Sequence, residues 1–518
     1  MDAFTISNIS RGSDRLWIHF ACLWFVSLYA LYLLYTEYNE ILIKRIQQLQ
    51  HIKDRSDQFT VLVREIPICP EHKARACSAD HFFSKYYPHD YHSYQILYNG
   101  KDVEELMSQA KSIARKINDL KERSVVKQTN RGTFLLDKSD RDKAKLAFQE
   151  EKLEEVRLKI NQLQGESTLK QKELPVAFVT FKSRLAATLV AQSQQHSHPL
   201  SWIASMAPEP RDVSWRNLAI PYRLLPLCRH IVFLAATLLT IFFAIPVTAV
   251  QGIAKFEKLK KWFPPAMAIQ LIPGLSSVVT GYLPSAILNG FIYIVPFAML
   301  GMAMLAGSIS KSKEEIKTCN MAFYFLVGNV FFLSLLSGSL LDQIGESFSH
   351  PKDIPTRLAS AVSAQVIVSP LLLPFLIGYF CLGYLVFINQ IKDVYNIIYE
   401  TCGEYWPQIH HYILIAVILM QITMIGLFGL KSKPAASVST IPLLVLTLMF
   451  NEYCKIRFLP SFRNFSVQSA KKNDELDVKS NRLEANYENA STAYSPPCLQ
   501  PLNFAASGST STQPFVSS

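Results

Sequence analysis

The chain has 518 residues and a formal net charge of +11, and 49% of its residues are hydrophobic. The apolar residues gather in blocks of about 20, the length at which a helix crosses the hydrocarbon core of a bilayer, so a fully soluble chain is excluded. The positive charge would suit a nucleic-acid-binding protein, but it equally suits a membrane protein whose cytosolic flanks attract anionic lipid. The composition therefore predicts an integral, multi-pass membrane protein.

Residues 16–38 form the first predicted transmembrane helix, whose inner end carries a belt of tyrosines at positions 29, 32, 35 and 38. Basic residues follow from Lys44 onward, and the positive-inside rule therefore places this end in the cytosol. Residues 1–15 are then external. Asn8, in the sequence Asn-Ile-Ser, becomes an external glycosylation acceptor.

Residues 39–222 are charged and polar, and they predict a cytosolic α+β domain. Alternating, β-rich segments predict strands at 59–67, 91–98 and 176–181, and helices are expected at 79–86 and 184–194. Between the second and third strands, apolar residues at heptad spacing predict an antiparallel helical hairpin over residues 102–164. This order of elements is typical of a split β-α-β domain of the ferredoxin-like or RNA-recognition type.

Residues 223–460 form the second membrane region, with six further spans predicted at Leu224–Val250, Pro284–Ala306, Ala322–Leu341, Val366–Ile388, Tyr412–Leu430 and Thr440–Asn451. The remaining segment, residues 461–518, is rich in Ser, Asn and Thr and has little apolar content. A disordered cytosolic tail is therefore expected there.

Polar residues inside the spans are the candidate site, because burying them in lipid costs free energy unless they face protein or water. They are Asn289, Asn329, Ser334, Ser337, Asp342 and Gln343. A water-lined ion pathway is one interpretation, and helix-helix contacts through small and hydroxyl side chains are the other. Pro246, Gly290, Pro296 and Gly301 are candidate gating kinks, or else static kinks that neighbouring helices accommodate.

Motifs for catalysis are absent: the sequence has no glycine-rich phosphate loop, Walker motif, Ser-His-Asp set or zincin motif. The chain is therefore not expected to be an enzyme or to carry a cofactor. The nine cysteines contain no Cys-x-x-Cys pair and no partnered histidines, so neither a disulfide framework nor a zinc site is indicated. The pair His410-His411 has no carboxylate at ligand spacing, and no metal is predicted there.

The strand at 176–181 resembles the central strand of an RNA-recognition module, in which Phe178 would stack against a base. The Arg/Lys-Gly-aromatic start of that motif is absent, with Leu174-Pro175-Val176 in its place. Nucleic acid is therefore not an expected partner, and the fold is predicted without the function.

Seven stretches of the sequence resemble one known family: DRLWIHF (14–20), DQFTVLVREIP (57–67), HFFSKYYP (81–88), AFVTFKSRLAA (177–187), NMAFYFLVGNVFFLSLLSGSLLDQIG (320–345), FINQIKDVY (387–395) and FNEYCKIRFLPSF (450–462). They are similar to the plant hyperosmolality-gated calcium-permeable channels, which are related to the early-responsive-to-dehydration proteins. The resemblance implies an anoctamin-like membrane bundle and an RNA-recognition-like cytosolic domain that helps to form a homodimer. It further implies flux of calcium and monovalent cations through the plasma membrane, opened by membrane tension or hyperosmotic stress, with membrane lipids as partners.

Two departures from the family pattern are expected to matter. Two spans of the family precede the one that begins here at Leu16, so the chain looks N-terminally short. After Gln365 the family continues into a further span and a cytosolic loop, whereas here Val366 begins the end of a later span. A membrane-crossing pair is therefore expected to be missing, and part of the pore lining with it.

Three functions stay open at this point. The first is a mechanically or osmotically gated, calcium-permeable, non-selective cation channel, or a truncated form of one. The second is a lipid-scramblase-like groove protein, and the third is a non-conducting subunit that pairs with full-length channels. An RNA-binding membrane protein is a remote alternative.

Overall fold

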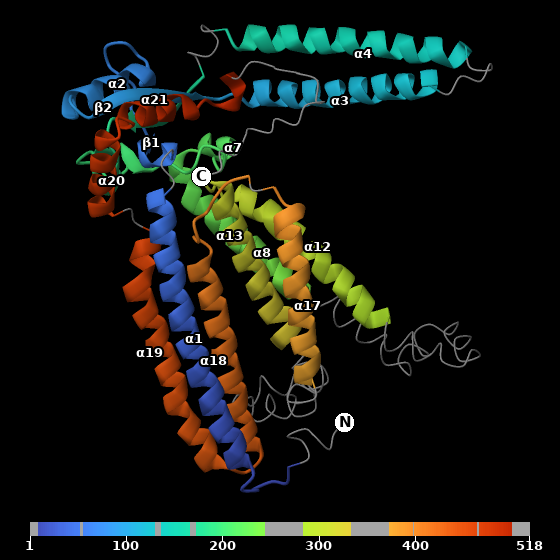
Figure 1. Ribbon diagram of the computed structural model, residues 1–518, viewed down its shortest axis with the longest axis vertical. Coiled ribbons are helices and arrows are strands. Elements are labelled where there is room, and N and C mark those ends of the chain that lie inside the picture. Colours follow the sequence, from blue (N-terminus) through green and yellow to red (C-terminus); the bar gives the residue numbers. More distant parts are fainter. Residues whose placement is uncertain are drawn as a thin grey trace. The chain divides into compact units, whose positions relative to one another are not determined.

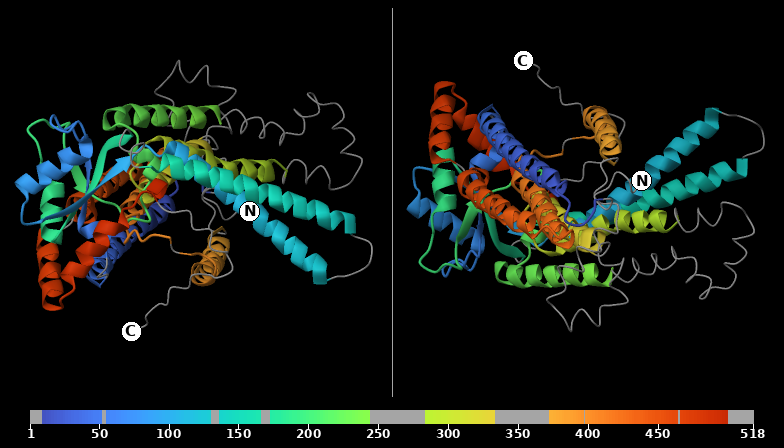
Figure 2. Two further views of the ribbon diagram at one scale, coloured as in Figure 1. Left: turned by 90° about the horizontal axis from the view of Figure 1, so that it is seen from above. Right: turned by 90° about the horizontal axis from the view of Figure 1, so that it is seen from below.

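A computed structural model of the chain describes residues 9–51, 55–129, 136–165, 172–243, 283–332, 372–396, 398–463 and 466–499. The chain divides into two compact units, which are drawn in Figures 1 and 2. The membrane unit comprises Met1–Lys53, Arg211–Val213 and Arg223–Ser469, and the soluble unit comprises Asp54–Pro210, Ser214–Tyr222 and Ala470–Ser518. Each unit is therefore assembled from segments that lie far apart in the sequence.

A four-stranded antiparallel sheet organises the soluble unit, with its strands in the order β2-β3-β1-β4. The strands are β1 (Thr60–Arg64), β2 (Tyr91–Tyr98), β3 (Glu173–Phe181) and β4 (Ile203–Met206), and the connecting helices are α2 (Arg75–Tyr86) and α6 (Arg184–Gln192). Two β-α-β halves with their first strands adjacent make a split β-α-β sheet. Strand β4, which completes the second half, was not among the predicted strands.

One face of the sheet packs against α2 and α6. Alternate residues of a strand point to the same face, so the side chains of every second residue in β1 and β3 enter one core. That core contains Val61, Val63, Ala177, Val179 and Phe181 from the strands, Ala79 and Phe83 from α2, and Ala187 and Val190 from α6. The position of α2 on the sheet is therefore fixed by apolar contacts along its length.

A helical hairpin is inserted between β2 and β3. Its helices α3 (Lys101–Thr129) and α4 (Leu136–Leu163) lie side by side in Figure 1. Their apolar residues are spaced by three and four, which places them on one face of each helix. The buried seam consists of Val103, Met107, Ala110, Ile113 and Ile117 from α3 and Val156 and Ile160 from α4.

The C-terminal segment is folded onto the soluble unit. Its elements are α20 (Val467–Lys479), α21 (Leu483–Ala493) and a 3-10 turn at Pro497–Leu499. The expectation of a disordered tail over 461–518 is therefore wrong for residues 467–499, and residues 500–518 lie outside the described part of the chain. The physical reason is that this segment has no core of its own: a few buried side chains complete another core, which composition alone does not reveal.

A buried ion pair holds α20 against α6. The guanidinium of Arg184 donates to Asp477 Oδ2 at 2.6 Å and lies 3.3 Å from Asp474 Oδ1. The backbone N–H of Leu185 also donates to Asp474, at 3.0 Å, at the start of α6. Because a buried charge is costly unless it is paired, these contacts fix the docking of α20.

The second face of the sheet is covered by the same C-terminal segment. The ring of Phe178 is 1% exposed and stacks on Tyr494 at 4.5 Å between ring centroids. The Tyr494 hydroxyl donates to the carbonyl oxygen of Pro208 at 2.8 Å. An RNA-recognition module binds bases on this face, so Phe178 has no room to stack against one. The structure therefore argues against the remote alternative of RNA binding through Phe178.

The membrane unit consists mainly of apolar helices, with a charged first half in α13. They are α1 (Leu16–His51), α8 (Leu225–Phe242), α12 (Leu283–Leu305), α13 (Lys311–Leu326), α17 (Leu372–Asp393), α18 (Trp406–Leu430) and α19 (Pro434–Arg463). Among the described residues, five helices are long and apolar enough to cross a membrane, and α12 contributes a shorter apolar helix at Ile292–Leu305. The predicted span at 322–341 is described only as far as residue 332.

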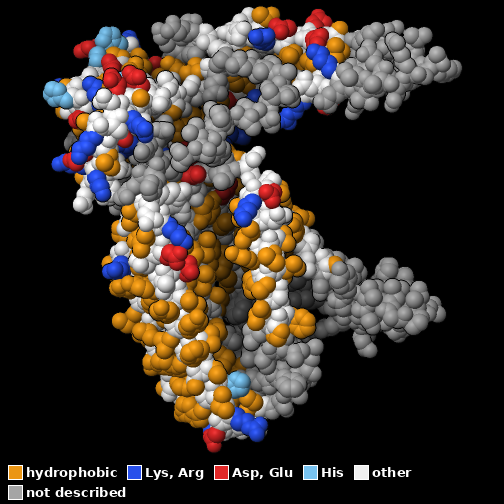
Figure 3. Space-filling view, in the orientation of Figure 1, with side chains coloured by type: hydrophobic (Ala, Val, Ile, Leu, Met, Phe, Trp, Pro, Cys, Tyr) orange, Lys and Arg blue, Asp and Glu red, His pale blue; other side chains and the backbone are white. Residues whose placement is uncertain are grey.

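Hydrophobic side chains, drawn in orange, cover much of the face of the membrane unit that Figure 3 shows. Phe25 of α1, Phe375 and Tyr379 of α17 and Met449 of α19 are all more than 60% exposed. Apolar surface on this scale exceeds what a soluble protein exposes to water and is typical of a lipid-facing bundle.

Helices α1, α18 and α19 pack into one bundle. Leu16 and Leu23 of α1 meet Leu427 of α18 and Leu443 of α19 in a buried cluster. At the other end of α1, the guanidinium of Arg45 donates to the carbonyl oxygens of Cys402 and Phe462 at 2.6 and 3.3 Å. Asn289 and Asn329, the two polar candidates among the described residues, lie on α12 and just after α13, outside this bundle.

Candidate ion pathway in the membrane unit

Helices α8, α12 and α13 form the part of the membrane unit that carries the candidate pathway. Their shared core is apolar and contains Ala236 and Phe243 at α8, Val295 and Met299 of α12, and Phe325 of α13. The rings of Phe243 and Phe325 meet edge to face at 4.7 Å between centroids. Through this contact, α8 packs against the end of α13 with large apolar side chains that exclude water.

A π-helical turn, Val327–Phe332, continues α13 directly beyond this contact. Such turns are rare and occur frequently at functional sites, because one extra residue per turn displaces the side chains that follow. Gly328 lies within it, and a Cβ added there would come 3.1 Å from Cγ2 of Thr240 on α8. A larger side chain at this position would therefore press on Thr240 where α8 approaches the π-helical turn.

Asn329 lies in the π-helical turn and is 4% exposed. Its amide nitrogen Nδ2 has no hydrogen-bond partner among the residues that the structure describes. Leaving a buried polar group unpaired costs about 1–3 kcal/mol, so such a group calls for a bound water, an ion or a functional role. The arrangement places an unpaired amide where sequence reasoning expected a polar pathway position.

The other predicted site residues fall into two groups. Asn289 and the kink candidates Gly290, Pro296 and Gly301 lie on α12, where all four are exposed and the helix continues through them. Asn289 and Asn329 therefore occupy different environments, one exposed and one buried. The remaining candidates lie outside the described residues: Asn8, Pro246, Ser334, Ser337, Asp342 and Gln343.

A polar junction between α13 and α18 was missed in the sequence. The side-chain oxygen of Asn320 accepts hydrogen bonds from Gln408 Nε2 at 2.5 Å and from the Tyr412 hydroxyl at 2.8 Å. The Tyr412 ring also stacks on Phe323 at 4.3 Å. Residues 408 and 412 are four apart and share one helix face, which was the available signal. The junction ties α13 to the α1–α18–α19 bundle.

The start of α13 is anchored by the short segment 211–213. The carboxylate of Asp212 accepts hydrogen bonds from the backbone N–H and the hydroxyl of Ser312 at 2.8 and 2.5 Å. Burial raises the pKa of Asp212, while the two bonds from Ser312 act in the opposite direction. A carboxylate at a helix N-terminus satisfies free N–H groups and favours the helix dipole, so α13 begins at a fixed point.

Four cysteine and histidine side chains form a cluster in the soluble unit, and His410 is buried in the membrane unit. The expectation that no histidines are partnered with cysteines is wrong, because Cys69, His72, Cys77 and His81 converge in the soluble unit. His410, by contrast, is buried in the bundle, where its ring packs against Tyr38 at 4.7 Å.

Comparison with protein families gives three matches along the chain. Residues 229–366 and 366–428 match "Calcium-dependent channel, 7TM region, putative phosphate", and residues 58–217 match "Cytosolic domain of 10TM putative phosphate transporter". Residues 1–37 match "Late exocytosis, associated with Golgi transport". The channel-region match is interrupted at Val366, where the sequence predicted a missing pair of spans.

Similar proteins are found in Arabidopsis thaliana. Hyperosmolality-gated Ca2+ permeable channel 2.5 is 54% identical, over 100% of this chain and 81% of the relative. Channels 2.3 and 2.1 of the same series are 34% and 32% identical, over 96% and 95% of this chain and 80% and 75% of those relatives. The alignment with channel 2.5 has 586 positions against 518 residues here, so at least 68 positions face a gap in this chain.

Identity at this level extends over the membrane unit and the soluble unit alike, and the seven stretches singled out in the sequence lie within it. The chain belongs to the family of hyperosmolality-gated calcium-permeable channels.

Proposed function

We propose that this chain is an osmotically gated, calcium-permeable cation channel whose pathway runs along α8, α12 and α13. Family membership supports the activity, since the relatives are named for hyperosmolality gating and calcium permeation. The structural observation that carries the pathway is the buried, unpaired amide of Asn329 beside the apolar Phe243–Phe325 contact. A polar group next to an apolar constriction is the combination that channels use for ion binding and for gating by dewetting.

In this mechanism the Asn329 side chain replaces part of the hydration shell of a passing cation. Its carbonyl oxygen faces the ion and its amide N–H groups donate to water. Asn289, Ser334, Ser337, Asp342 and Gln343 extend the polar path, and Pro246, Gly290, Pro296 and Gly301 allow the helices to bend. Membrane tension separates α8 from α13 at the Phe243–Phe325 contact and admits water.

The proposal includes finer features that the family resemblance implies. The membrane unit is an anoctamin-like bundle, and the soluble unit is RNA-recognition-like in fold and joins two copies into a homodimer. Calcium and monovalent cations are the permeant ions, the stimulus reaches the helices through membrane lipid, and the plasma membrane is the site of action.

The test is the current and calcium influx of cells that express the chain, recorded under membrane stretch and after hyperosmotic shock. We expect Asn329→Leu, which removes the amide and keeps a similar volume, to reduce single-channel conductance severalfold. Asn389→Leu is the matched control on the exposed surface of α17, outside the proposed pathway, and should conduct like the unchanged chain. Unaltered conductance in the Asn329 variant would remove this residue from the pathway, and transbilayer movement of a fluorescent lipid without current would favour a scramblase-like groove.

A non-conducting subunit is the second candidate, and a specific observation favours it. The channel-region match breaks at Val366, and at least 68 aligned positions of channel 2.5 have no counterpart among the 518 residues here. Pairing with full-length channels through the soluble unit would then be the role of the chain.

A further inference from the structure

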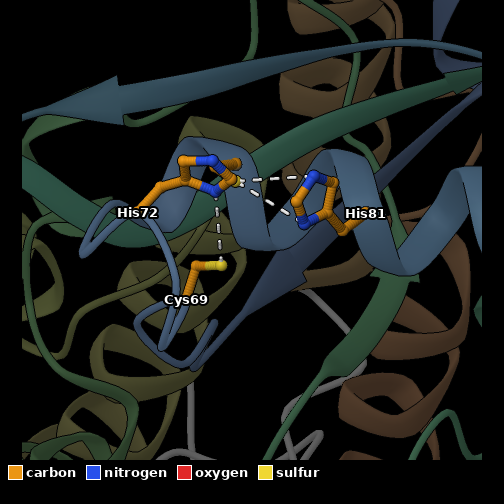
Figure 4. Close-up of side chains that lie close together, drawn as sticks. Cys69, His72 and His81 are labelled. Atoms are coloured by element: carbon orange, nitrogen blue, oxygen red, sulfur yellow. Dashed lines mark hydrogen bonds between the residues drawn. The ribbon is translucent and has the colours of Figure 1, made fainter.

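Two cysteines and two histidines converge in the soluble unit at the start of α2. Cys69, His72, Cys77 and His81 each offer one ligand atom, and these atoms all lie within 4.8 Å of one another. Figure 4 shows the Cys69 thiol and the rings of His72 and His81 turned toward one another beside α2. The chain places these residues at the spacing Cys-x2-His-x4-Cys-x3-His, so one pair comes from a loop and the other from a helix.

The loop pair is held by its own backbone. The N–H of Cys69 donates to the carbonyl oxygen of Ala74 at 3.1 Å, and the N–H of Lys73 donates to the carbonyl oxygen of Cys69 at 3.0 Å. Lys73 adopts the left-handed conformation with φ of 50°, which turns the chain back toward the helix. Cys69 itself is 4% exposed. These contacts preset the direction of the first two ligands without any metal.

The helix pair is held by the position of α2. Residues 77 and 81 are four apart and therefore lie on one face of the helix. The helix is fixed at its start by Glu173 of β3, whose carboxylate accepts a hydrogen bond from the backbone N–H of Arg75 at 2.7 Å. Further along, Phe83 is fully buried in the core of the sheet. The backbone that carries the second pair of ligands is therefore held in place, while the rings of His72 and His81 are exposed.

The distances fit a tetrahedral site. Zinc binds cysteine sulfur at about 2.3 Å and histidine nitrogen at about 2.0–2.1 Å, so neighbouring ligand atoms of a tetrahedron lie roughly 3.4–3.8 Å apart. The sulfur of Cys77 lies 3.1 Å from His72 Nδ1 and 3.6 Å from His81 Nδ1, and that of Cys69 lies 4.0 Å from His72 Nδ1. The four ligand atoms all lie within 4.8 Å of one another, so shifts of up to about 1 Å would bring them to tetrahedral bonding geometry.

We propose that Cys69, His72, Cys77 and His81 bind a structural zinc ion in the soluble unit. Two thiolates and two imidazoles in tetrahedral arrangement select zinc over hard cations such as calcium and magnesium, which prefer oxygen ligands. All four positions are filled by protein, so the site has no open position for catalysis. The ion pins the loop after β1 to α2, and its binding energy adds to the stability of the sheet.

A disulfide between Cys69 and Cys77 is the competing use of the same residues. Both cysteines are free thiols here. A disulfide would use only the two thiols and would not explain why the rings of His72 and His81 converge on them, whereas a metal ion would bind all four groups. Reducing conditions in the cytosol also disfavour the bond.

The experiment measures metal in the full-length chain, purified in detergent with a reducing agent and no chelator. We expect one equivalent of zinc per chain by mass spectrometry of the metal. Replacement by Co²⁺ should give the visible bands of a tetrahedral site and the near-ultraviolet thiolate charge-transfer band. Removal of zinc with a chelator should lower the unfolding temperature of the unchanged chain.

Two ligand variants and two matched controls complete the test. Cys77→Ser and His81→Gln should lose zinc and the cobalt spectrum, whereas Cys381→Ser on α17 and His89→Gln, both exposed and outside the cluster, should keep them. The cobalt spectrum of the unchanged chain does not depend on whether the variants fold. Three results would overturn the proposal: no zinc or cobalt bound under reducing conditions, equal loss of metal in the controls, or a Cys69–Cys77 disulfide in freshly prepared protein.

Discussion

Gly100 lies where the C-terminal 3-10 turn, Pro497–Leu499, packs against the helical hairpin, and only glycine leaves room for that contact. A Cβ added at residue 100 would lie 2.5 Å from Cβ and 2.8 Å from Sγ of Cys498, which is closer than real side chains approach. Cys498 is buried against α3, and Gln164 Nε2 donates to its carbonyl oxygen at 2.8 Å. The contact therefore couples one glycine to the docking of the whole segment 467–499.

We expect Gly100→Ala to release the C-terminal turn from the hairpin, because overpacking of this kind costs about 1–3 kcal/mol. Limited trypsin digestion should then cut at Lys471, Lys472 and Lys479 several times faster than in the unchanged chain. The double variant Gly100→Ala with Cys498→Gly removes both clashing atoms and should restore resistance. Equal digestion of the single variant and the unchanged chain would show that the turn is not held by this contact.

The π-helical turn at Val327–Phe332 is the element through which the pathway can be tested without touching Asn329. A methyl group at residue 328 would press on Thr240 Cγ2, and alanine also favours a regular α-helix over the glycine it replaces, by about 1 kcal/mol. Both effects weaken the packed arrangement of α8 against α13. We therefore expect Gly328→Ala to lower the membrane tension at which half of the channels open, measured in stretch-activated patch recordings.

Two further variants, one that should reverse the effect and one control, show whether the threshold change comes from the contact with Thr240. Thr240→Ser removes Cγ2 and keeps the hydroxyl that donates to Ala236, so it should return the threshold of Gly328→Ala toward its original value. Gly378→Ala on α17 introduces the same methyl group into open space and should leave the threshold unchanged. A threshold shift of equal size in the Gly378 variant would assign the effect to helix propensity rather than to the contact.

Elements with strong local periodicity were visible in the sequence, and those held by contacts with distant residues were not. β1 and β3 alternate and α3 carries a heptad seam, so their positions were predicted closely. Strand β4 has four residues, all half-buried, and gives no such signal. Helices α20 and α21 are polar, and their order comes from Arg184 and Phe178, which lie hundreds of residues earlier.

The candidate sites divide in the same way, into features with a local sequence pattern and features that depend on contacts between distant residues. Asn329 was singled out in the sequence because an amide inside an apolar span is conspicuous, and its place in an ion pathway stays a prediction. The π-helical turn around it was not singled out, since it involves the approach of Thr240 from another helix. The Cys–His cluster was missed because its ligands are split between a loop and a helix and do not form a Cys-x-x-Cys pair. The spacing of Cys77 and His81 by four residues was the usable signal.

At the scale of the whole molecule, conduction depends on whether the helices of this chain line a complete pathway across the membrane. The channel-region match breaks at Val366, and the alignment with channel 2.5 leaves at least 68 positions unmatched by the 518 residues of this chain. A cation that crosses the bilayer needs polar groups or water in place of its lost hydration shell along the whole thickness of the membrane. A pathway that lacks part of its lining should therefore conduct less than a complete one.

We expect insertion of the unmatched segment of channel 2.5 between Gln365 and Val366 to increase the stretch-activated current severalfold over that of the 518-residue chain. Asn329→Leu should reduce the current of the extended chain as well, because the amide on the π-helical turn serves both forms. Surface labelling must show equal amounts of the two proteins in the membrane, so that the comparison reports conduction rather than delivery. Equal currents with and without the insertion would mean that α8, α12 and α13, with the residues that follow them, already form the whole conducting path.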